Sequence, residues 1–339
     1  MDIEIQLVMR KAEQLYNIKL LHRIHMGGSG NIIFAAESGQ RPYILRVSKG
    51  GGSSLAHIDF ELNWVEYLSL RMEGIVQPIR SVNNRLYEVI ESDGGAYVLC
   101  LMKKAEGKLV DCNNPAEFNE VLFSNLGALM GRMHKLTADY EGNRPCPQFQ
   151  WNGPYFWRRD IAIPDELVRQ GEKRFLKEIN ALPAAKENYG IIHFDIHTDN
   201  FFMKNTKITL FDFFDCQYNW YAADIASAMF FMVQRGAGPL KHLSEKERTA
   251  FAESYLISYL QGYLQSNYIS KYWICTIDLF MKYQMVDEYV AASNYWPEED
   301  THLQQRYLDW HRERIAHNQP YVYIDYDNVL DRLPKVPFI

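Results

Sequence analysis

The sequence lacks the marks of a nucleic-acid-binding protein. Its 339 residues carry 36 basic and 42 acidic side chains, a formal net charge of −6, and the basic residues form no run. Nucleic-acid binding needs a basic patch or stripe. We therefore expect no nucleic-acid partner.

Cysteine is scarce and long apolar runs are missing. The five cysteines show no C-x-x-C spacing, so they suggest neither a disulfide framework nor a zinc ribbon, and a reducing compartment fits best. No apolar run reaches the ~18 residues that cross a membrane, and the N-terminus is the reverse of a signal peptide. We predict a cytoplasmic protein without a membrane partner. A homodimer is a working hypothesis that no motif supports.

Apolar residues make up 47% of the chain, enough for a sizeable core. Up to the polar connector at 103–107, a helical stripe at 3–16 and a second at 54–72 accompany short β-rich runs at 20–24, 31–36, 41–47, 76–80, 86–91 and 96–102. Beyond the connector, helical periodicity dominates, at about 118–134, 165–181, 221–234, 245–264, 268–290 and 300–316. The pattern predicts an α+β chain with an N-terminal lobe, 1–102, and a mainly helical C-terminal lobe, 103–339.

A glycine-rich loop separates the first two β-rich runs. Gly27, Gly28, Ser29 and Gly30 leave little side chain to block a ligand, so the backbone N–H groups of this loop could approach phosphate oxygens. Glycines in a hairpin loop are also ordinary turn chemistry. Taken alone, the loop favours the turn interpretation.

The stretch 190–215 places polar side chains between apolar runs that resemble buried strands. Histidine and aspartate alternate at His193, Asp195, His197 and Asp199, and on a regular strand these four side chains would share one face. One hypothesis is therefore a metal-dependent hydrolase.

A second hypothesis is phosphoryl transfer from ATP. That chemistry needs a carboxylate to orient and deprotonate a hydroxyl, oxygen ligands for Mg²⁺ and a cover over the phosphates. Asp195, Asn200 five positions later and Asp212 after the next β-rich run supply the carboxylate and the ligands in order. The glycine-rich loop would supply the cover.

The run from His193-Phe-Asp195 to Asn200, with Leu210-Phe-Asp-Phe-Phe-Asp215 and Asp224-Ile-Ala226, resembles the aminoglycoside phosphotransferase and choline kinase family, which has a protein-kinase-like fold. The resemblance implies a bilobal fold that uses ATP and Mg²⁺. It also implies that Asp195 is the catalytic base and that Asn200 and Asp212 hold the metal. Asp215 matches a recurrent acidic position to which we assign no role.

The resemblance implies further nucleotide-binding residues in the N-terminal lobe. Arg46 falls where kinases carry a phosphate-binding lysine, Glu61 falls where its partner glutamate lies, and the backbone of Leu101, Met102 and Lys103 would bind adenine. Arginine in place of lysine is not a neutral exchange. It is the one feature that favours a nucleotide-binding pseudokinase.

Other polar residues near the motif have structural interpretations. His134 is expected to pack, His193 to be buried and satisfied, and His197 and Asp199 to orient the loop or approach the substrate. Asp224 either caps the helix that begins near it or braces the catalytic loop.

The acceptor is expected to be the hydroxyl of a small molecule. Phe194 stands where regulated protein kinases often have a phosphate-reading arginine, and twelve positions from Asp212 to Asp224 leave little room for a peptide platform. A protein Ser/Thr kinase is thus a weaker alternative. Acids and aromatics of the last helices would suit a cationic aminoglycoside- or choline-like acceptor, or one like homoserine, although such residues are usually core or solvated: Tyr283, Asp287, Glu288, Tyr289, Tyr295, Trp296, Glu298, Glu299 and Asp300.

Overall fold

The structure, a computed structural model, describes residues 3–24, 31–50, 53–92, 95–142, 146–154, 160–296 and 300–334. The chain divides into two compact units. Unit 1 comprises Met1–Gly107 and Thr209–Phe214, and unit 2 comprises Lys108–Ile208 and Asp215–Ile339. The chain first passes from unit 1 to unit 2 after Gly107, and the short segment 209–214 belongs to unit 1.

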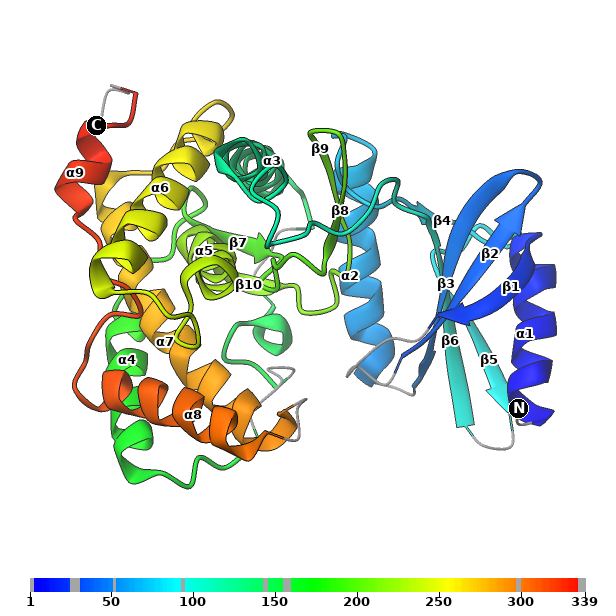
Figure 1. Cartoon of the computed structure of the whole chain (residues 1–339). Coiled ribbons are helices and arrows are strands. Elements are labelled where there is room, and N and C mark those ends of the chain that lie inside the picture. The colour runs from blue at the N-terminus through cyan, green and yellow to red at the C-terminus, as the bar shows by residue number, and fades with distance from the viewer. Residues whose placement is uncertain are drawn as a thin grey trace. The chain divides into compact units, whose positions relative to one another are not determined.

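Unit 1 is an antiparallel sheet with two helices (Figure 1). The strand order is β1-β2-β3-β6-β4, and β5 pairs with β6. The elements in chain order are α1 (Ile3–Tyr16), β1 (Lys19–Ile24), β2 (Ile32–Ser38), β3 (Arg41–Lys49), α2 (Ser53–Ser69), β4 (Pro78–Ile79), β5 (Glu88–Ser92) and β6 (Gly95–Lys103).

Alternation along β6 explains why both faces of this sheet are covered. Leu99 and Leu101 belong to the apolar cluster that contains Val8 and Ala12 of α1. Val98 and Cys100 belong instead to a cluster with Ile58 and Leu62 of α2. Successive side chains of a strand point to opposite faces, so each helix covers one face of the sheet.

Unit 2 is mainly helical and contains two small two-stranded sheets, β7 with β10 and β8 with β9. The last two residues of β9 are assigned to unit 1. The elements are α3 (Glu120–Ala138), the 3-10 turn η1 (Pro147–Phe149), α4 (Glu166–Asn180), β7 (Tyr189–Ile192), β8 (Phe201–Lys204), β9 (Lys207–Leu210), β10 (Gln217–Trp220), α5 (Tyr221–Ala237), α6 (Glu245–Tyr263), α7 (Lys271–Tyr295), α8 (Thr301–Ala316) and α9 (Tyr326–Asp331).

Glycines let α3 and α6 approach to backbone contact. A Cβ atom added at Gly127 would lie 1.9 Å from the carbonyl oxygen of Tyr259, and one added at Gly262 would lie 1.9 Å from that of Ser124. Gly131 faces the carbonyl oxygen of Tyr263 in the same way, at 2.5 Å. We call these three residues the glycine seam. Backbone at such distances leaves no room for a methyl group.

The elements expected from periodicity are confirmed within a few residues. The long helix expected to end near His134 continues to Ala138, and periodicity does not predict the short helix α9. The alternating run 193–199 is not a strand, because β7 ends at Ile192. None of the helices in the described ranges is long and apolar enough to span a membrane.

Candidate active site

The catalytic-loop candidate begins where β7 ends. Phe194 has φ 70°, which is rare for a bulky side chain. Its N–H donates to Asp224 Oδ1 at 2.8 Å, the N–H of His193 donates to Asp224 Oδ2 at 3.2 Å, and the Ser227 hydroxyl donates to the Phe194 carbonyl. These bonds hold the strained turn that presents Asp195.

The Asp224 carboxylate also belongs to a buried hydrogen-bond network with His134 and Tyr263. His134 Nε2 lies 2.9 Å from Asp224 Oδ2, and the Tyr263 hydroxyl lies 2.9 Å from His134 Nδ1. A carboxylate only accepts, so we assign the proton to Nε2 and, for a neutral imidazole, the acceptor role to Nδ1. Asn267 donates to the same tyrosine oxygen at 3.1 Å, consistent with a Tyr263 O–H that donates to His134.

The network distinguishes the two interpretations of Asp224. The residue lies in the first turn of α5, but its carboxylate binds the loop, and the N-cap Trp220 makes no side-chain capping bond. Asp224 and His134 are both fully buried. Asp224 therefore braces the loop, and His134 packs beneath it as expected.

Asp195 and Asn200 are adjacent, as their spacing suggested. The Asn200 amide nitrogen donates to the backbone carbonyl of Asp195 and to its Oδ2, both at 2.8 Å. His197 Nε2 lies 3.4 Å from the same carboxylate oxygen. Burial acts to raise the pKa of Asp195, but hydrogen bonds from His197 and Asn200 and the nearby histidine charges hold that pKa below its usual range. Asp195 is thus an ionised carboxylate near neutral pH.

The pKa of His197 shifts in the opposite direction to the pKa of Asp195. Burial would lower its pKa, but the hydrogen bond to Asp195 and the charges of Asp195 and Asp199 raise the pKa above its ordinary value. Asp199 also pairs with Arg235, in an ion pair exposed to solvent. Both His197 and Asp199 orient the loop, which matches one of the roles expected for them.

The metal-cluster hypothesis finds no support in the described part of the chain. No group of three or more His, Cys, Asp or Glu side chains there could hold a metal ion. Asn200 instead offers its one side-chain oxygen, Oδ1, as a single metal ligand. Because the amide nitrogen faces Asp195, Oδ1 is directed elsewhere, and no described residue donates a hydrogen bond to it. A hard cation such as Mg²⁺ prefers such an oxygen.

Arg46 and Glu61 form a bidentate ion pair within unit 1. Arg46 Nη1 donates to Glu61 Oε1 at 2.8 Å, and Nη2 donates to Oε2 at 2.7 Å. Burial would lower the pKa of Arg46, but the charges of Glu61, Cys100 and Asp212 keep that pKa above its usual value. The Nε–H of Arg46 is buried and has no partner among the described residues. It is an available donor of the kind that phosphate oxygens accept.

Asp212 lies in the segment that returns to unit 1. It has φ 59°, a left-handed conformation that aspartate tolerates better than most residues. Its charge contributes to the raised pKa of Arg46, and the guanidinium of Arg46 stands over the Phe214 ring at 5.9 Å. Strained backbone of this kind is often found at functional sites.

The remaining nucleotide-binding candidates are less informative. Leu101, Met102 and Lys103 are the last residues of β6, and the Lys103 N–H donates to the Gln77 carbonyl at 2.8 Å. The donor of Lys103 is therefore engaged within the sheet. The loop residues Gly27, Gly28, Ser29 and Gly30 lie outside the described residues.

Two acids of α7, Asp287 and Glu288, lie near each other, and the charges of Asp287 and Asp195 both contribute to the raised pKa of Glu288. Glu288 accepts from the Tyr307 hydroxyl at 3.0 Å and from Gln234 at 3.3 Å, and burial raises the pKa of Glu288 to about 7. Asp300 caps α8, and Asp287 is buried. Glu298 and Glu299 lie outside the described residues. Glu288 is thus bonded within unit 2, and Asp300 serves as a helix cap.

Several residues of the site carry no recognisable sequence signal. Ser227 and Tyr263 support the loop, yet neither belongs to a motif, and Tyr263 is 129 positions from its partner His134. Only the helical spacing from Asp224 to Ser227 hints that both could face the loop.

Comparisons with known proteins agree with the motif. Residues 22–267 match the family model described as the phosphotransferase enzyme family. The chain is 28% identical over 256 residues to the amicoumacin kinase of Bacillus subtilis (strain 168), an alignment that covers 74% of each chain.

Solved structures give the same fold. The amicoumacin kinase hAmiN in complex with AMP-PNP, Ca²⁺ and Ami is 25% identical, with a TM-score of 0.82 over 96% of each chain. A choline kinase from Cryptosporidium parvum Iowa II is 12% identical, with a TM-score of 0.59 over 93% of this chain and 97% of its own. The choline kinase shows likeness of fold alone. The expected protein-kinase-like fold is confirmed.

Proposed function

Since the chain belongs to the phosphotransferase enzyme family, we propose that it transfers the γ-phosphate of ATP, with Mg²⁺, to a hydroxyl of a small molecule. The observation that carries this proposal is the geometry of Asp195, an ionised carboxylate held at 2.8 Å by Asn200 on a loop braced from behind. A base placed beside an amide oxygen that can bind a cation is what phosphoryl transfer requires of a protein.

In this proposal Asp195 acts on the acceptor. Its carboxylate accepts a hydrogen bond from the acceptor hydroxyl, orients the oxygen toward the γ-phosphorus and takes the proton as the oxygen–phosphorus bond forms and the bond to the ADP oxygen breaks. The lowered pKa of Asp195 keeps the carboxylate ready to accept. His197 and Asn200 fix its orientation.

Other residues act on the nucleotide. Arg46, held by Glu61, binds phosphate oxygens, while the backbone of Gly27, Gly28, Ser29 and Gly30 covers the phosphates. Adenine binds along the backbone at Leu101, Met102 and Lys103, with the Lys103 carbonyl rather than its engaged N–H as the contact. In these assignments 1–102 is the nucleotide-binding lobe, and 103–339 is the catalytic and acceptor-binding lobe.

Asn200 and Asp212 are the proposed oxygen ligands of Mg²⁺. The ion, when bound, neutralises charge on the transferred phosphate. The amide of Asn200 supports this role, because its nitrogen is committed to Asp195 while its oxygen is not bonded within the described chain.

An ATP-consumption screen tests the proposal. The panel contains amicoumacin, aminopropanol, choline, homoserine and aminoglycosides, and ³¹P NMR identifies any phosphorylated product. We expect Mg²⁺-dependent turnover that disappears in the Asp195→Ala and Asp212→Ala proteins. Turnover that persists in either variant contradicts its assigned role. If ATP raises the Tm while no acceptor is phosphorylated, the chain is a pseudokinase. Sedimentation velocity tests the predicted homodimer.

A further inference from the structure

Unit 2 contains a cavity of about 130 Å³ where the ends of three helices meet. Its wall is formed by the first residues of α5, the last residue of α6, the connection from α6 to α7 and the first turn of α7, together with two residues that precede β7. An engineered cavity of about 150 Å³ in another protein binds benzene. The cavity of unit 2 is therefore large enough for a ligand with a single ring.

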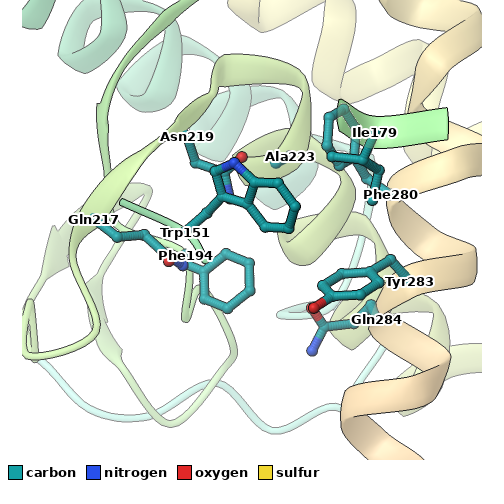
Figure 2. A pocket seen from close by; sticks show the side chains of 9 residues that line it. All are labelled: Trp151, Ile179, Phe194, Gln217, Asn219, Ala223, Phe280, Tyr283 and Gln284. Carbon is teal, nitrogen blue, oxygen red and sulfur yellow. The ribbon is translucent and has the colours of Figure 1, made fainter. Parts of the chain in front are cut away.

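A smaller space adjoins Phe194 of the catalytic loop. Figure 2 shows the side chains around it, among them Trp151, Gln217 and Tyr283. Its volume is about 10 Å³, which is roughly the space that one water molecule needs. Of these two spaces in unit 2, the larger one is therefore the candidate for a ligand site.

Two residues of the cavity wall contact His134, which packs beneath Asp224. The ring of Tyr221 stacks on the His134 imidazole, with centroids 4.5 Å apart and 16° between the ring planes. The Tyr263 hydroxyl lies 2.9 Å from His134 Nδ1, and its ring meets the imidazole edge-on. His134 in turn donates to Asp224, which accepts from the Phe194 N–H. Three contacts thus connect the cavity wall with the turn before the proposed base.

The wall of the cavity is aromatic, and a carboxylate lies on its exposed side. Tyr221, Tyr263 and Trp273 are each at most 9% exposed, whereas Tyr268 is 42% exposed. Among the described residues that line the cavity, Glu187 alone is charged, and it is exposed. Aromatic rings attract cations, and a carboxylate supplies the opposite charge. This lining favours a ring that carries an ammonium group.

The helix ends indicate how such a ligand would be oriented. The N-termini of α5 and α7 carry partial positive charge, which disfavours an ammonium group among the buried rings. Beside the exposed Glu187 the ammonium group keeps part of its hydration. We therefore place the ring inside the cavity and the ammonium group at its exposed side.

Exposed aromatic residues beside the cavity are a further sign of a binding surface. Tyr268 and Tyr272 are 42% and 53% exposed, and both lie near the start of α7. The Tyr272 ring also meets Trp273 edge-on, with centroids 5.0 Å apart. Single exposed apolar residues are ordinary, but residues that gather in one place mark interaction sites.

We propose that the cavity binds a small aromatic amine, at a site separate from those of the nucleotide and the acceptor. The ring of the amine lies among Tyr221, Tyr263 and Trp273, and its ammonium group lies beside Glu187. The ligand adds van der Waals contacts to the two tyrosines that contact His134, so it favours the arrangement that braces the catalytic loop. This binding goes beyond the proposed kinase function and does not depend on it.

Benzylamine and benzyl alcohol are matched probes, because they differ only in the ammonium group. Saturation-transfer NMR titrations against the full-length protein at neutral pH give a Kd for each. We expect benzylamine to bind about three- to tenfold more tightly, and Glu187→Gln to remove most of that difference. Trp273→Leu should weaken both probes by about three- to tenfold, because it removes an aromatic wall.

Glu313→Gln is the matched control for the carboxylate. Glu313 is an exposed residue of α8, so its replacement should leave the preference for benzylamine unchanged. Circular dichroism and the Tm identify any variant that does not fold. If Trp273→Leu fails to fold, Tyr268→Ala replaces it, because Tyr268 lines the cavity at an exposed position.

Hydrogen exchange tests the link to the catalytic loop. Saturating benzylamine should slow exchange of the Phe194 amide by about fivefold, the lower end of typical coupling between two sites. Tyr263→Phe keeps the ring in the cavity wall but removes the hydroxyl that reaches His134. Benzylamine should therefore still bind to this variant, but it should no longer slow the exchange.

Three outcomes would overturn the inference. They are equal binding of the two probes, a preference for benzylamine that persists in Glu187→Gln, and unchanged exchange at Phe194 when benzylamine is bound. Preference that depends on Glu187, together with slowed exchange, supports it. None of these measurements uses ATP or an acceptor, so failure of the kinase proposal would be seen separately, in the turnover screen.

Discussion

Arg46 and Asp195 are held in opposite ways. Arg46 lies in β3, Glu61 lies in α2, and their side chains pair directly in a buried ion pair. Asp195 lies in a loop, and the bonds from Asp224 reach the backbone before it rather than its own carboxylate. Arg46 is thus fixed by a charged partner on another element, whereas Asp195 depends on the conformation of its loop, within which Asn200 and His197 orient the carboxylate.

The difference predicts how the loss of a supporting residue would affect Arg46 and Asp195. Regular elements keep Arg46 near its position even when its partner changes, so loss of Glu61 acts mainly through charge. The turn at Phe194 has a positive φ that the chain would not adopt unaided. Loss of Asp224 should therefore act through geometry. Three predictions test this contrast, in order of expected effect on activity, and a fourth concerns the stability of unit 2.

Asp195→Asn should have the largest effect. It keeps the size of the side chain and removes the base, so kcat should fall by about 100- to 10,000-fold. Initial rates with an accepted substrate measure the loss, and the Kd for ATP should be unchanged. Asp327→Asn serves as the control, because Asp327 forms an exposed ion pair with Lys271 and should keep wild-type rates. A kcat within threefold of wild type in Asp195→Asn would rule out the role of base.

Asp224→Asn should disturb the conformation of the catalytic loop without altering any group that contacts the reacting atoms. The amide keeps one acceptor oxygen but turns a donor toward a neighbouring donor, His134 or a loop N–H. We expect a 10- to 100-fold loss in kcat, within the range by which misplaced catalytic groups slow reactions (about 100-fold for ~1 Å). Hydrogen exchange at the Phe194 amide should accelerate in parallel. Lost activity with unchanged exchange would contradict a positioning role.

Glu61→Leu should leave the Arg46 charge buried and unpaired, which costs about 3–5 kcal/mol of unfolding free energy. The double variant Arg46→Met with Glu61→Leu should recover much of that stability, because an apolar pair can replace a buried ion pair. It should still bind ATP about tenfold more weakly, since the phosphate donor is gone. Urea unfolding and ATP titration separate the two effects. Wild-type ATP affinity in the double variant would show that Arg46 is only structural.

Glu288→Gln should have the smallest effect, and on stability rather than on the loop. Burial raises the pKa of Glu288 from 4.5 to about 7 in the folded chain. The stabilisation from its protonated form is fully present below pH 4.5 and is lost as pH rises through about 7. Glutamine stays neutral, so the variant should be more stable than wild type at pH 8 by roughly 2–4 °C in Tm. The difference should vanish near pH 4.5, where wild-type Glu288 is protonated too.

The sequence predicts those parts of the site whose residues are close together along the chain. Asp195 and Asn200 lie in one loop, so their spacing sets their contact. The alternation of β6 and the helical stripes predict the layers of unit 1 in the same way. Pattern over a few residues is enough in these cases.

Long-range partners were not predictable in this way. The Tyr263 hydroxyl contacts His134 because α3 and α6 pack together, and no local sequence pattern near either residue predicts this contact. The acids of the last helices show the same limit, because composition does not tell that Glu288 accepts from Tyr307 of α8, whereas Asp300 caps its own helix. Trp151 and Gln217 likewise reach one pocket only through the folding of distant segments.

The glycine seam has a consequence for any mutational scan of this protein. A methyl group at Gly131 would meet the backbone of Tyr263, the residue whose hydroxyl reaches His134 and, through it, Asp224. Alanine there should abolish activity without any contact to substrate. A map of intolerant positions would therefore mark the seam as strongly as the catalytic loop. Intolerance at Gly131 would report the spacing of two helices, and only a stability measurement would tell it from chemistry.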